Sequence, residues 1–350
     1  RKHPGAKRVT DYREVFEASN IDGIVCSTPD HMHAVVVSAA LKRGLPVYCE
    51  KPLTHSVYEA RLLRQLNAQA RVPTQMGNQI HSGANYRRVV EIVRSGAIGA
   101  VERVHVWQGG GVRSFPNVKP SDPPKHIHYD QWIGPAPFRP YSDAHFHFNW
   151  RYWWDFGGGQ LADFGCHFMD LPFWALELRH PTKVAAEGPK VHPETCPLGL
   201  IVRYDFPARG SMPPVKLTWY DGDLIPKKIA DQPVPANGVM FVGTDGMMFA
   251  DYSRYRLFPT DKFASFKAPA ESIPNSIGHH AEWIKACKDG SPTTCNFDYS
   301  GALTETVLLG TVAYRLGKTL DWDAANLTAT NAPEAAKLIN KEYRKGWEVV

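Results

Sequence analysis

Long apolar runs, paired cysteines and concentrated basic segments are all absent from this sequence of 350 residues. No apolar run reaches the roughly 18 residues that a membrane-spanning helix needs, so no membrane partner is expected. The six cysteines are scattered without a C-x-x-C pair, which argues against a disulfide framework or a structural zinc site. Lys and Arg number 40 against 35 Asp and Glu and are spread along the chain, so no nucleic-acid partner is expected either.

The composition is that of a folded protein, with 43% hydrophobic and 21% charged residues, and the length allows two domains. In residues 1–97, short β-branched runs alternate with helical segments of 10–15 residues, which is typical of βαβ units around a parallel sheet. The run at 21–28 is apolar enough to predict a strand that is covered on both faces. The expected strands are 21–28, 46–50 and 72–77, and the expected helices begin at Asp11, at Pro29, after Ser56 and at Asn85.

The pattern changes after Gly99. Residues 101–108 alternate as an antiparallel strand does, and residues 109–150 are rich in Gly, Pro and aromatics, which predicts a long functional loop. A helix is expected at 157–177, strands at 200–206, 214–222 and 238–252, and helices at 279–290, 301–318 and 332–347. We therefore expect an α/β protein: a partial Rossmann-type parallel sheet in residues 1–97, and an α+β domain in residues 98–350 with a large, mostly antiparallel open sheet. The last helices could pack back on the first domain.

Glu50, Lys51 and Pro52 close a predicted parallel strand at its carboxyl end, the edge where open α/β sheets bind ligands. A lysine at the mouth of a dry crevice can hydrogen-bond a substrate hydroxyl and help to move its proton. A solvated lysine beside a turn proline is the alternative interpretation.

Asp163 and His167 are four residues apart on a predicted helix and would share one face. A carboxylate beside an imidazole orients it and raises its basicity, which is how a general base is built. The alternatives are a buried structural histidine, or a metal site formed with Asp170. We predict no metal, because the spacing demands no further ligand.

Thr28, Pro29, Asp30, His31 and His33 follow the first predicted strand and begin a helix, where backbone amides favour phosphate groups. Taken together, the segment TPDHMHAVVVSAALKRGLPVYCEKPLTHSVYEA, the segment GGGQLADFGCHFMD and the closing SIGHHAEWIKACKDG resemble the Gfo/Idh/MocA oxidoreductase family along nearly the whole chain. The resemblance is greatest to the bacterial members that have sugar substrates.

The resemblance implies that Lys51, Asp163 and His167 serve catalysis, and that the Lys51–Pro52 bond is cis, as it often is in the family. It implies NAD or NADP as the cofactor, along a path that includes Thr28, Pro29, His31, Glu50 and Lys51. His33 and Gln79 are expected near the nicotinamide half. The implied reaction is hydride transfer between the nicotinamide and a hydroxyl of a sugar or cyclitol.

A substrate site is predicted from the aromatic-rich segment 145–155, where Asn149 and Arg151 could bond sugar hydroxyls and aromatic faces could pack on C–H surfaces. Core or interface packing is an equal alternative for this segment. Of the neighbouring histidines at 279 and 280, at most one can line a pocket, and we assign that role to His280.

The family pattern is broken at the start of the chain. No G-x-G-x-x-G turn precedes the predicted βαβ units, and the clusters 109–111 and 157–159 lie too far downstream to serve as that fingerprint. At about 30 residues per βαβ unit, we expect that roughly 60–80 residues precede the third strand of a complete Rossmann sheet.

Two other functions stay open. Some members of the family cleave glycosidic bonds by transient oxidation and elimination with a recycled NAD, and a chain without its phosphate cradle could also be inactive. We expect a homo-oligomer, a dimer or tetramer, formed through the large sheet. A cytoplasmic location is expected, and a periplasmic one stays open because many relatives carry an export signal.

Overall fold

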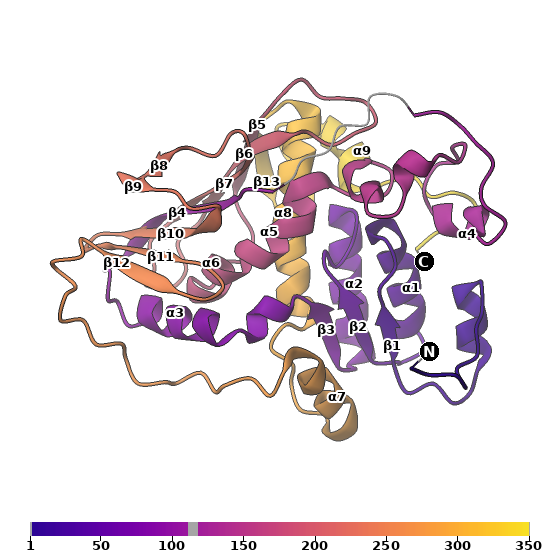
Figure 1. Cartoon of the computed structure of the whole chain (residues 1–350), viewed down its shortest axis with the longest axis horizontal. Helices are drawn as coiled ribbons and strands as arrows, with labels where there is room; N and C mark the ends of the chain where they lie inside the picture. Colours follow the sequence, from indigo (N-terminus) through magenta and orange to yellow (C-terminus); the bar gives the residue numbers. More distant parts are fainter. Residues whose placement is uncertain (1, 111–117, 350) are drawn as a thin grey trace.

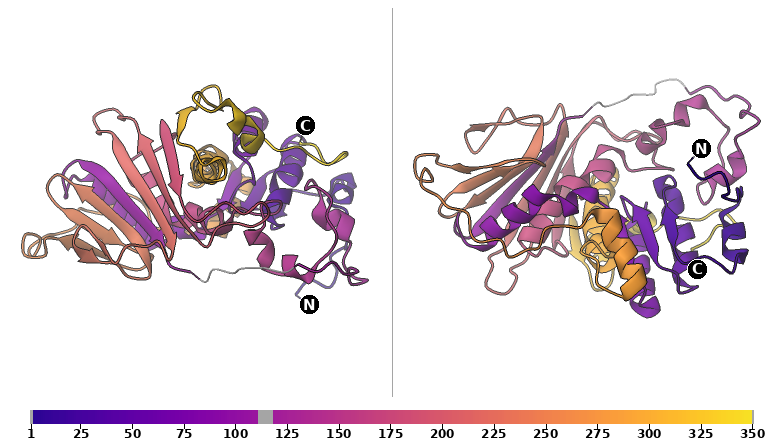
Figure 2. Two further views of the ribbon diagram at one scale, coloured as in Figure 1. Left: turned by 90° about the horizontal axis from the view of Figure 1, so that it is seen from above. Right: turned by 60° about the horizontal axis from the view of Figure 1, so that its bottom comes forward.

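The computed structural model describes residues 2–110 and 118–349, and its two main sheets lie on either side of a long central helix (Figure 1). That helix, α8 (Phe297–Leu316), is almost entirely buried. It packs on α2 of the first sheet's layer and on α5 and β5 of the second part. Figure 2, which views the molecule from two further sides, shows the same order of layers. Because α8 is apolar nearly all round, it acts as the shared core element of both parts.

The first part contains three parallel strands in the order β1–β2–β3, which confirms the predicted partial Rossmann sheet. Its helices begin where the sequence predicts them. Ser56 and Glu59 form the expected capping box at the start of α2, and Asp11 and Glu14 form another at the first helix, which is 3-10 rather than α. The elements are η1 (Tyr12–Glu17), β1 (Ile24–Cys26), α1 (Asp30–Leu41), β2 (Val47–Glu50), α2 (Val57–Ala70), β3 (Thr74–Gly77), η2 (Gln79–Ser82) and α3 (Ala84–Arg94).

The prediction that the first strand is covered on both faces was wrong. Ile24 and Cys26 are buried on the side of α1, but the side chain of Val25 is 61% exposed on the other side. Among the described residues, β1 pairs with β2 alone and is therefore an edge strand. The strand therefore has more apolar side chains than the neighbouring elements bury.

The second part is built on nine strands in the order β12–β11–β10–β4–β7–β6–β5–β13–β14. All neighbours are antiparallel except β4 and β7, so the predicted large, mostly antiparallel sheet is confirmed. A small hairpin, β8 (Lys228–Ile229) with β9 (Gln232–Pro233), stands apart from it. The nine strands are β4 (Val101–Gln108), β5 (Lys183–Glu187), β6 (Gly199–Phe206), β7 (Val215–Gly222), β10 (Asn237–Gly243), β11 (Met247–Ala250), β12 (Tyr255–Phe258), β13 (Leu320–Asp323) and β14 (Thr328–Ala329).

The single helix predicted at 157–177 is two helices, α5 (Gly159–Phe168) and α6 (Asp170–Ala175). Pro172 explains the break, because proline has no N–H to donate and its ring would collide with the carbonyl of Phe168 in a continuous helix. Farther along the chain, α7 (His279–Asp289) forms as predicted.

The segment 109–150, predicted as a loop, contains short helices: α4 (Tyr129–Ile133), η3 (Asp143–His145) and the start of η4 (Asn149–Tyr152). Residues 111–117 of that prediction lie outside the described part of the chain. Within the described ranges, no helix combines the length and the apolarity needed to cross a membrane.

The helix predicted at 332–347 is reduced to η5 (Pro333–Ala335) and α9 (Ala336–Ile339). The chain after Ile339 is not helical, and its side chains bind the first part and the segment around α4 instead. Lys341 and Tyr343 both contact the carboxylate of Glu59, at 2.9 and 2.8 Å, and Arg344 donates to the carbonyl of Gly134. These tertiary contacts outweigh the helical tendency of the sequence.

A buried ion pair fixes α2 to α8. The guanidinium of Arg61 donates to both carboxylate oxygens of Glu305, at 3.1 and 2.9 Å, and the side chain of Glu305 is fully buried. We expect Glu305→Ala to lower the free energy of unfolding by about 3–5 kcal/mol, because it leaves Arg61 without its buried partner. Denaturant unfolding measures the loss.

The matched control is Glu187→Ala. Glu187 pairs with Arg203 at the surface, where its side chain is 62% exposed, and its removal should cost about 1 kcal/mol or less. Equal losses from the two variants would show that α2 and α8 do not depend on this pair.

Candidate active site

Lys51 and Asp163 come from different parts of the chain and meet at the carboxyl end of the small sheet. Lys51 directly follows β2, and its ammonium group contacts both a carboxylate oxygen and the backbone carbonyl oxygen of Asp163 on α5. The two side chains are only 15% and 8% exposed. The Lys51–Pro52 bond is cis, as the resemblance implied. The contact therefore lies in a largely water-excluded position at the edge where such sheets bind ligands.

Arg151 joins the same carboxylate. Its Nε donates to Oδ1 of Asp163 at 3.2 Å, and its guanidinium lies over the rings of Trp150 and Phe148. The turn between η4 and α5 permits this approach, since a Cβ at Gly157 would lie 2.7 Å from the Cα of Arg151. Asp163 is thus held between two cations, one from each side of the site.

His167 is bound by Asn78, a residue that the sequence reasoning missed. Nδ1 of His167 lies 2.6 Å from Oδ1 of Asn78, and the amide of Asn78 is held in place by its donation to the carbonyl of Cys166 at 2.9 Å. Because a carbonyl only accepts, the Nδ2 of Asn78 must face Cys166 and its Oδ1 must face the imidazole. Nδ1 of His167 therefore carries the proton and Nε2 carries the lone pair.

The prediction that Asp163 orients His167 was wrong, since the carboxylate of Asp163 is taken up by Lys51 and Arg151. Position explains the difference: Asn78 immediately follows β3 and reaches the site from the same sheet edge as Lys51. Burial and, after it, the charge of Lys51 lower the pKa of His167 to about 3, although the charge of Asp163 opposes both. His167 is therefore neutral at physiological pH and able to accept a proton.

A recess of about 320 Å³ opens beside this cluster. Thr28, Pro29, Glu50 and Lys51 line it from the small sheet, and Arg151 lines it from the second part. Its size falls at the lower end of ligand pockets. With His33, which also lines the recess, five of the predicted cofactor residues and one predicted substrate residue are brought together.

Asp30 also lines the recess, and the sequence reasoning gave it no role. It is the first residue of α1, and it is only 4% exposed. Burial raises the pKa of its carboxyl group to about 7, and the charge of His33 works in the opposite direction. It begins the helix that follows β1, as Lys51 follows β2 and Asn78 follows β3, and this position at the carboxyl ends of the strands is the signal that could have identified it.

The rings of His31 and His33 are enclosed. His31 is fully buried against Trp132 and Phe156, and its Nε2 lies 2.9 Å from the carbonyl of Trp132. Burial lowers the pKa of His31 to about 3. His33 borders the recess, but each of its ring nitrogens is bound to a backbone carbonyl. Both rings therefore serve packing and loop positioning in this structure.

The remaining predicted residues lie around the recess or outside it. Gln79 donates to the hydroxyl of Tyr48 at 3.0 Å and to the carboxylate of Glu50. The carboxylate of Glu50 lies against Gly77, and a Cβ added at Gly77 would be 2.3 Å from Oε2 of Glu50. His280 is exposed on α7 and stacked on Tyr48, so it is not among the residues that line the recess. Asn149 lies on η4, two residues from Arg151.

The metal alternative built on Asp163, His167 and Asp170 fails. Asp170 is fully buried elsewhere, where its carboxylate binds Nδ1 of His81 at 2.9 Å and the hydroxyl of Tyr299 at 2.7 Å. In the described part of the chain, the one group of three side chains with metal-ligand spacing is Cys26, His33 and Cys49.

Comparison with known proteins agrees with this fold. Residues 1–78 match the NAD-binding Rossmann fold of an oxidoreductase family, and residues 83–349 match the family's C-terminal alpha/beta domain. The chain therefore carries the two domains of a family of oxidoreductases with an NAD-binding Rossmann fold. The chain belongs to the Gfo/Idh/MocA family.

Among curated relatives, the chain is 34% identical to inositol 2-dehydrogenase 4 of Saccharopolyspora erythraea over 102 residues, which is 29% of this chain and 30% of that protein. It is 36% identical to the inositol 2-dehydrogenase of Leifsonia xyli over 97 residues, which is 27% of this chain and 29% of that protein. The matched segments therefore span less than a third of these relatives.

Two solved structures share the fold. GenD2 from gentamicin A biosynthesis, in complex with NAD, has a TM-score of 0.61 at 18% identity, covering 92% of this chain and 84% of its own. The aldose–aldose oxidoreductase from Caulobacter crescentus, complexed with glycerol, has a TM-score of 0.57 at 15% identity, covering 89% and 82%.

The residues at the recess fit one end of an NAD molecule. Thr28, Glu50 and Lys51 stand at the carboxyl ends of adjacent parallel strands, where dinucleotides bind in such sheets. The residues that precede β1 in this sequence hold no G-x-G-x-x-G turn.

The state of His167 is directly measurable. We expect ¹⁵N chemical shifts to show the Nδ1–H tautomer at neutral pH, with no protonation until the pH falls well below 6.5, because the folded pKa is near 3. Asn78→Ala should abolish the preference for that tautomer. Asn85→Ala is the control, since Asn85 binds the carbonyl of Asp251 instead. Protonation of His167 near pH 6.5 would contradict the assignment.

Proposed function

We propose that the protein transfers a hydride between a nicotinamide cofactor and a hydroxyl group of a sugar or cyclitol. The observation that carries this proposal is the meeting of Lys51 with Asp163 beside a neutral His167, at the end of a sheet that belongs to an NAD-binding family. When bound, the nicotinamide supplies the hydride chemistry, and the protein supplies positioning and proton transfer.

His167 is the base in this proposal. Its Nδ1–H is engaged by Asn78, so Nε2 is the nitrogen that takes the proton of the substrate hydroxyl. Among the described residues, Nε2 has no hydrogen-bond partner that would compete for its lone pair. The low pKa of His167 keeps that lone pair available over the whole physiological pH range.

Lys51 stabilises the negative charge that develops on the substrate oxygen. Its ammonium group has three N–H donors, and two of its contacts go to the carboxylate and the backbone carbonyl of Asp163. The third donor can face the reacting oxygen at a site from which most water is excluded, where such a hydrogen bond is worth most. Asp163 positions Lys51, and Arg151 in turn holds Asp163.

A polyhydroxylated substrate suits the surroundings. The recess is polar, with Thr28, Glu50 and Arg151 at its walls, and Trp150 adds an aromatic surface of the kind that packs on sugar C–H groups. The curated relatives include inositol 2-dehydrogenases, and a structural neighbour is an aldose–aldose oxidoreductase. For Arg151 and Asn149 we propose contacts to substrate hydroxyls.

Replacing Lys51 or His167 by Ala should lower kcat/KM by at least about a hundredfold, because each removes a group that acts on the transferred proton or the developing charge. The assay follows NADH formation with myo-inositol and a panel of aldoses. Lys262→Ala is the matched control, because Lys262 is an exposed lysine that binds the carbonyl of Asp245. Near-normal rates for either site variant, with unchanged melting temperature, would refute the assigned roles.

A further inference from the structure

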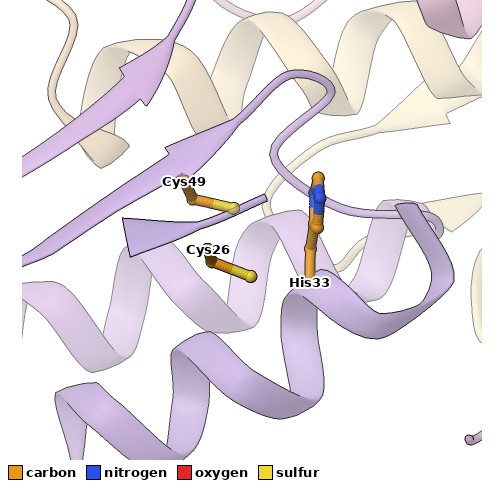
Figure 3. A group of neighbouring side chains, drawn as sticks. All are labelled: Cys26, His33 and Cys49. Atoms are coloured by element: carbon orange, nitrogen blue, oxygen red, sulfur yellow. The ribbon is translucent and has the colours of Figure 1, made fainter. Parts of the chain in front are cut away.

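Behind the recess, Cys26, His33 and Cys49 form a compact buried cluster (Figure 3). Cys26 on β1 and Cys49 on β2 are paired in register, so their side chains leave the sheet on the same face, toward α1. One ligand atom from each of the three residues lies within 4.8 Å of the others. Exposure is 2% for Cys26, 1% for His33 and 0% for Cys49.

His33 joins two loops that border the recess. Its Nδ1 lies 2.8 Å from the carbonyl oxygen of Pro52, and its Nε2 lies 2.8 Å from the carbonyl oxygen of Thr28. A carbonyl can only accept, so the ring satisfies both contacts only when both nitrogens carry protons. This geometry favours the charged imidazolium, and a buried cation needs an anion close by.

Cys26 supplies that anion. Its Sγ lies 3.4 Å from the hydroxyl of Thr28, and the Cys49 thiol can donate to it from the neighbouring strand. The hydrogen bond from Cys49 lowers the pKa of Cys26 to about 6, although burial opposes this. Burial lowers the pKa of His33, but the charges of Cys26 and Asp30 and the two carbonyls outweigh it and raise that pKa overall. Burial raises the pKa of Cys49, so it remains a thiol.

The same contacts argue against a metal site. A metal needs a lone pair on one imidazole nitrogen, but both nitrogens of His33 already face carbonyl oxygens. A thiolate beside a thiol is instead the arrangement of a reactive dithiol. Paired residues on neighbouring strands are about 4.8 Å apart, within the range of Cα separations that a disulfide spans. Thr28, whose hydroxyl contacts Sγ of Cys26, and His33 both line the recess, so the recess is the side from which a small molecule would reach the buried pair.

We propose that Cys26 and Cys49 are a peroxide-sensitive dithiol pair that closes to a disulfide. The thiolate of Cys26 attacks one oxygen of hydrogen peroxide and the O–O bond breaks. Hydroxide departs, and Cys26 becomes a sulfenic acid. The Sγ of Cys49 then attacks the Sγ of Cys26, and the second hydroxide departs with the proton of Cys49 as water. The two sulfurs together lose two electrons, and the peroxide gains them.

Disulfide formation alters the loops around the recess. It removes the charge of Cys26, the larger of the two negative charges that raise the pKa of His33, and a neutral His33 has one N–H to share between the carbonyls of Thr28 and Pro52. One of the two loops is therefore released. Thr28 and Lys51 stand on these loops, so, on the basis of the function proposed above, oxidation weakens cofactor binding.

The experiment treats the protein with a small excess of hydrogen peroxide in a Cys287→Ser background, which removes the half-exposed cysteine. Six cysteines less Cys287 leave five, and we expect the thiols titrated after denaturation to fall from five to three. Peptide mapping should find Cys26 joined to Cys49. The oxidation rate should rise through a midpoint near pH 6, well below the value of about 8.5 for a free cysteine.

Two variants separate the steps. Cys49→Ser should stop the reaction at the sulfenic acid of Cys26, which dimedone traps, and Cys26→Ser should abolish both products. Cys295→Ser is the matched control, since Cys295 is equally buried and burial raises its pKa; it should still lose two thiols to peroxide, from four to two, and form the same Cys26–Cys49 disulfide. These readouts need no substrate, so they stand or fall independently of the proposed oxidoreductase activity.

Three outcomes would overturn the proposal. The first is a full thiol count after peroxide treatment, and the second is a Cys26 that reacts no faster than Cys295. The third is stoichiometric zinc in the purified protein that is lost in Cys26→Ser, which would make the cluster a metal site.

Discussion

One partly buried ion pair, between Lys51 and Asp163, joins the two parts of the chain at the place where the chemistry is proposed. Removing two charges from water is costly, and the cost is offset here by the attraction within the pair, by the backbone carbonyl of Asp163 and by Arg151. Because Lys51 is fixed by the end of β2 and Asp163 by the first turns of α5, the pair ties the geometry of the site to the packing of both sheets against α8.

Much of this arrangement was predictable from the sequence. The β-branched runs separated by helical segments predicted the parallel sheet, and the alternation in residues 101–108 predicted an antiparallel strand of the large sheet. The placement of Lys51 at a strand end, and of Asp163 and His167 four residues apart on a helix, predicted their convergence in part. Lys51 and Asp163 are in contact, and the charges of both act on His167. The homo-oligomeric state remains a prediction.

Other features depend on tertiary contacts that local patterns do not contain. The partner of His167 is Asn78, whose sequence neighbours give no hint that it faces a helix almost ninety residues away. The sequence predicted that His31 and His33 lie along the cofactor path. In the structure, the ring of His31 packs against Trp132 and Phe156, and both nitrogens of His33 face backbone carbonyls. The closing segment reads as a helix, but Lys341 and Tyr343 gain more by binding Glu59 than by continuing one.

The central claim is that Lys51 and His167 act on one substrate as a single unit, and a double-mutant cycle on kcat/KM tests it most directly. If the two groups work together, the variant carrying both Lys51→Ala and His167→Ala will be about as slow as the slower single variant. Once one of the two groups is removed, the other no longer contributes to the rate. Losses that multiply in full would show that the two residues act independently, and would contradict the common site.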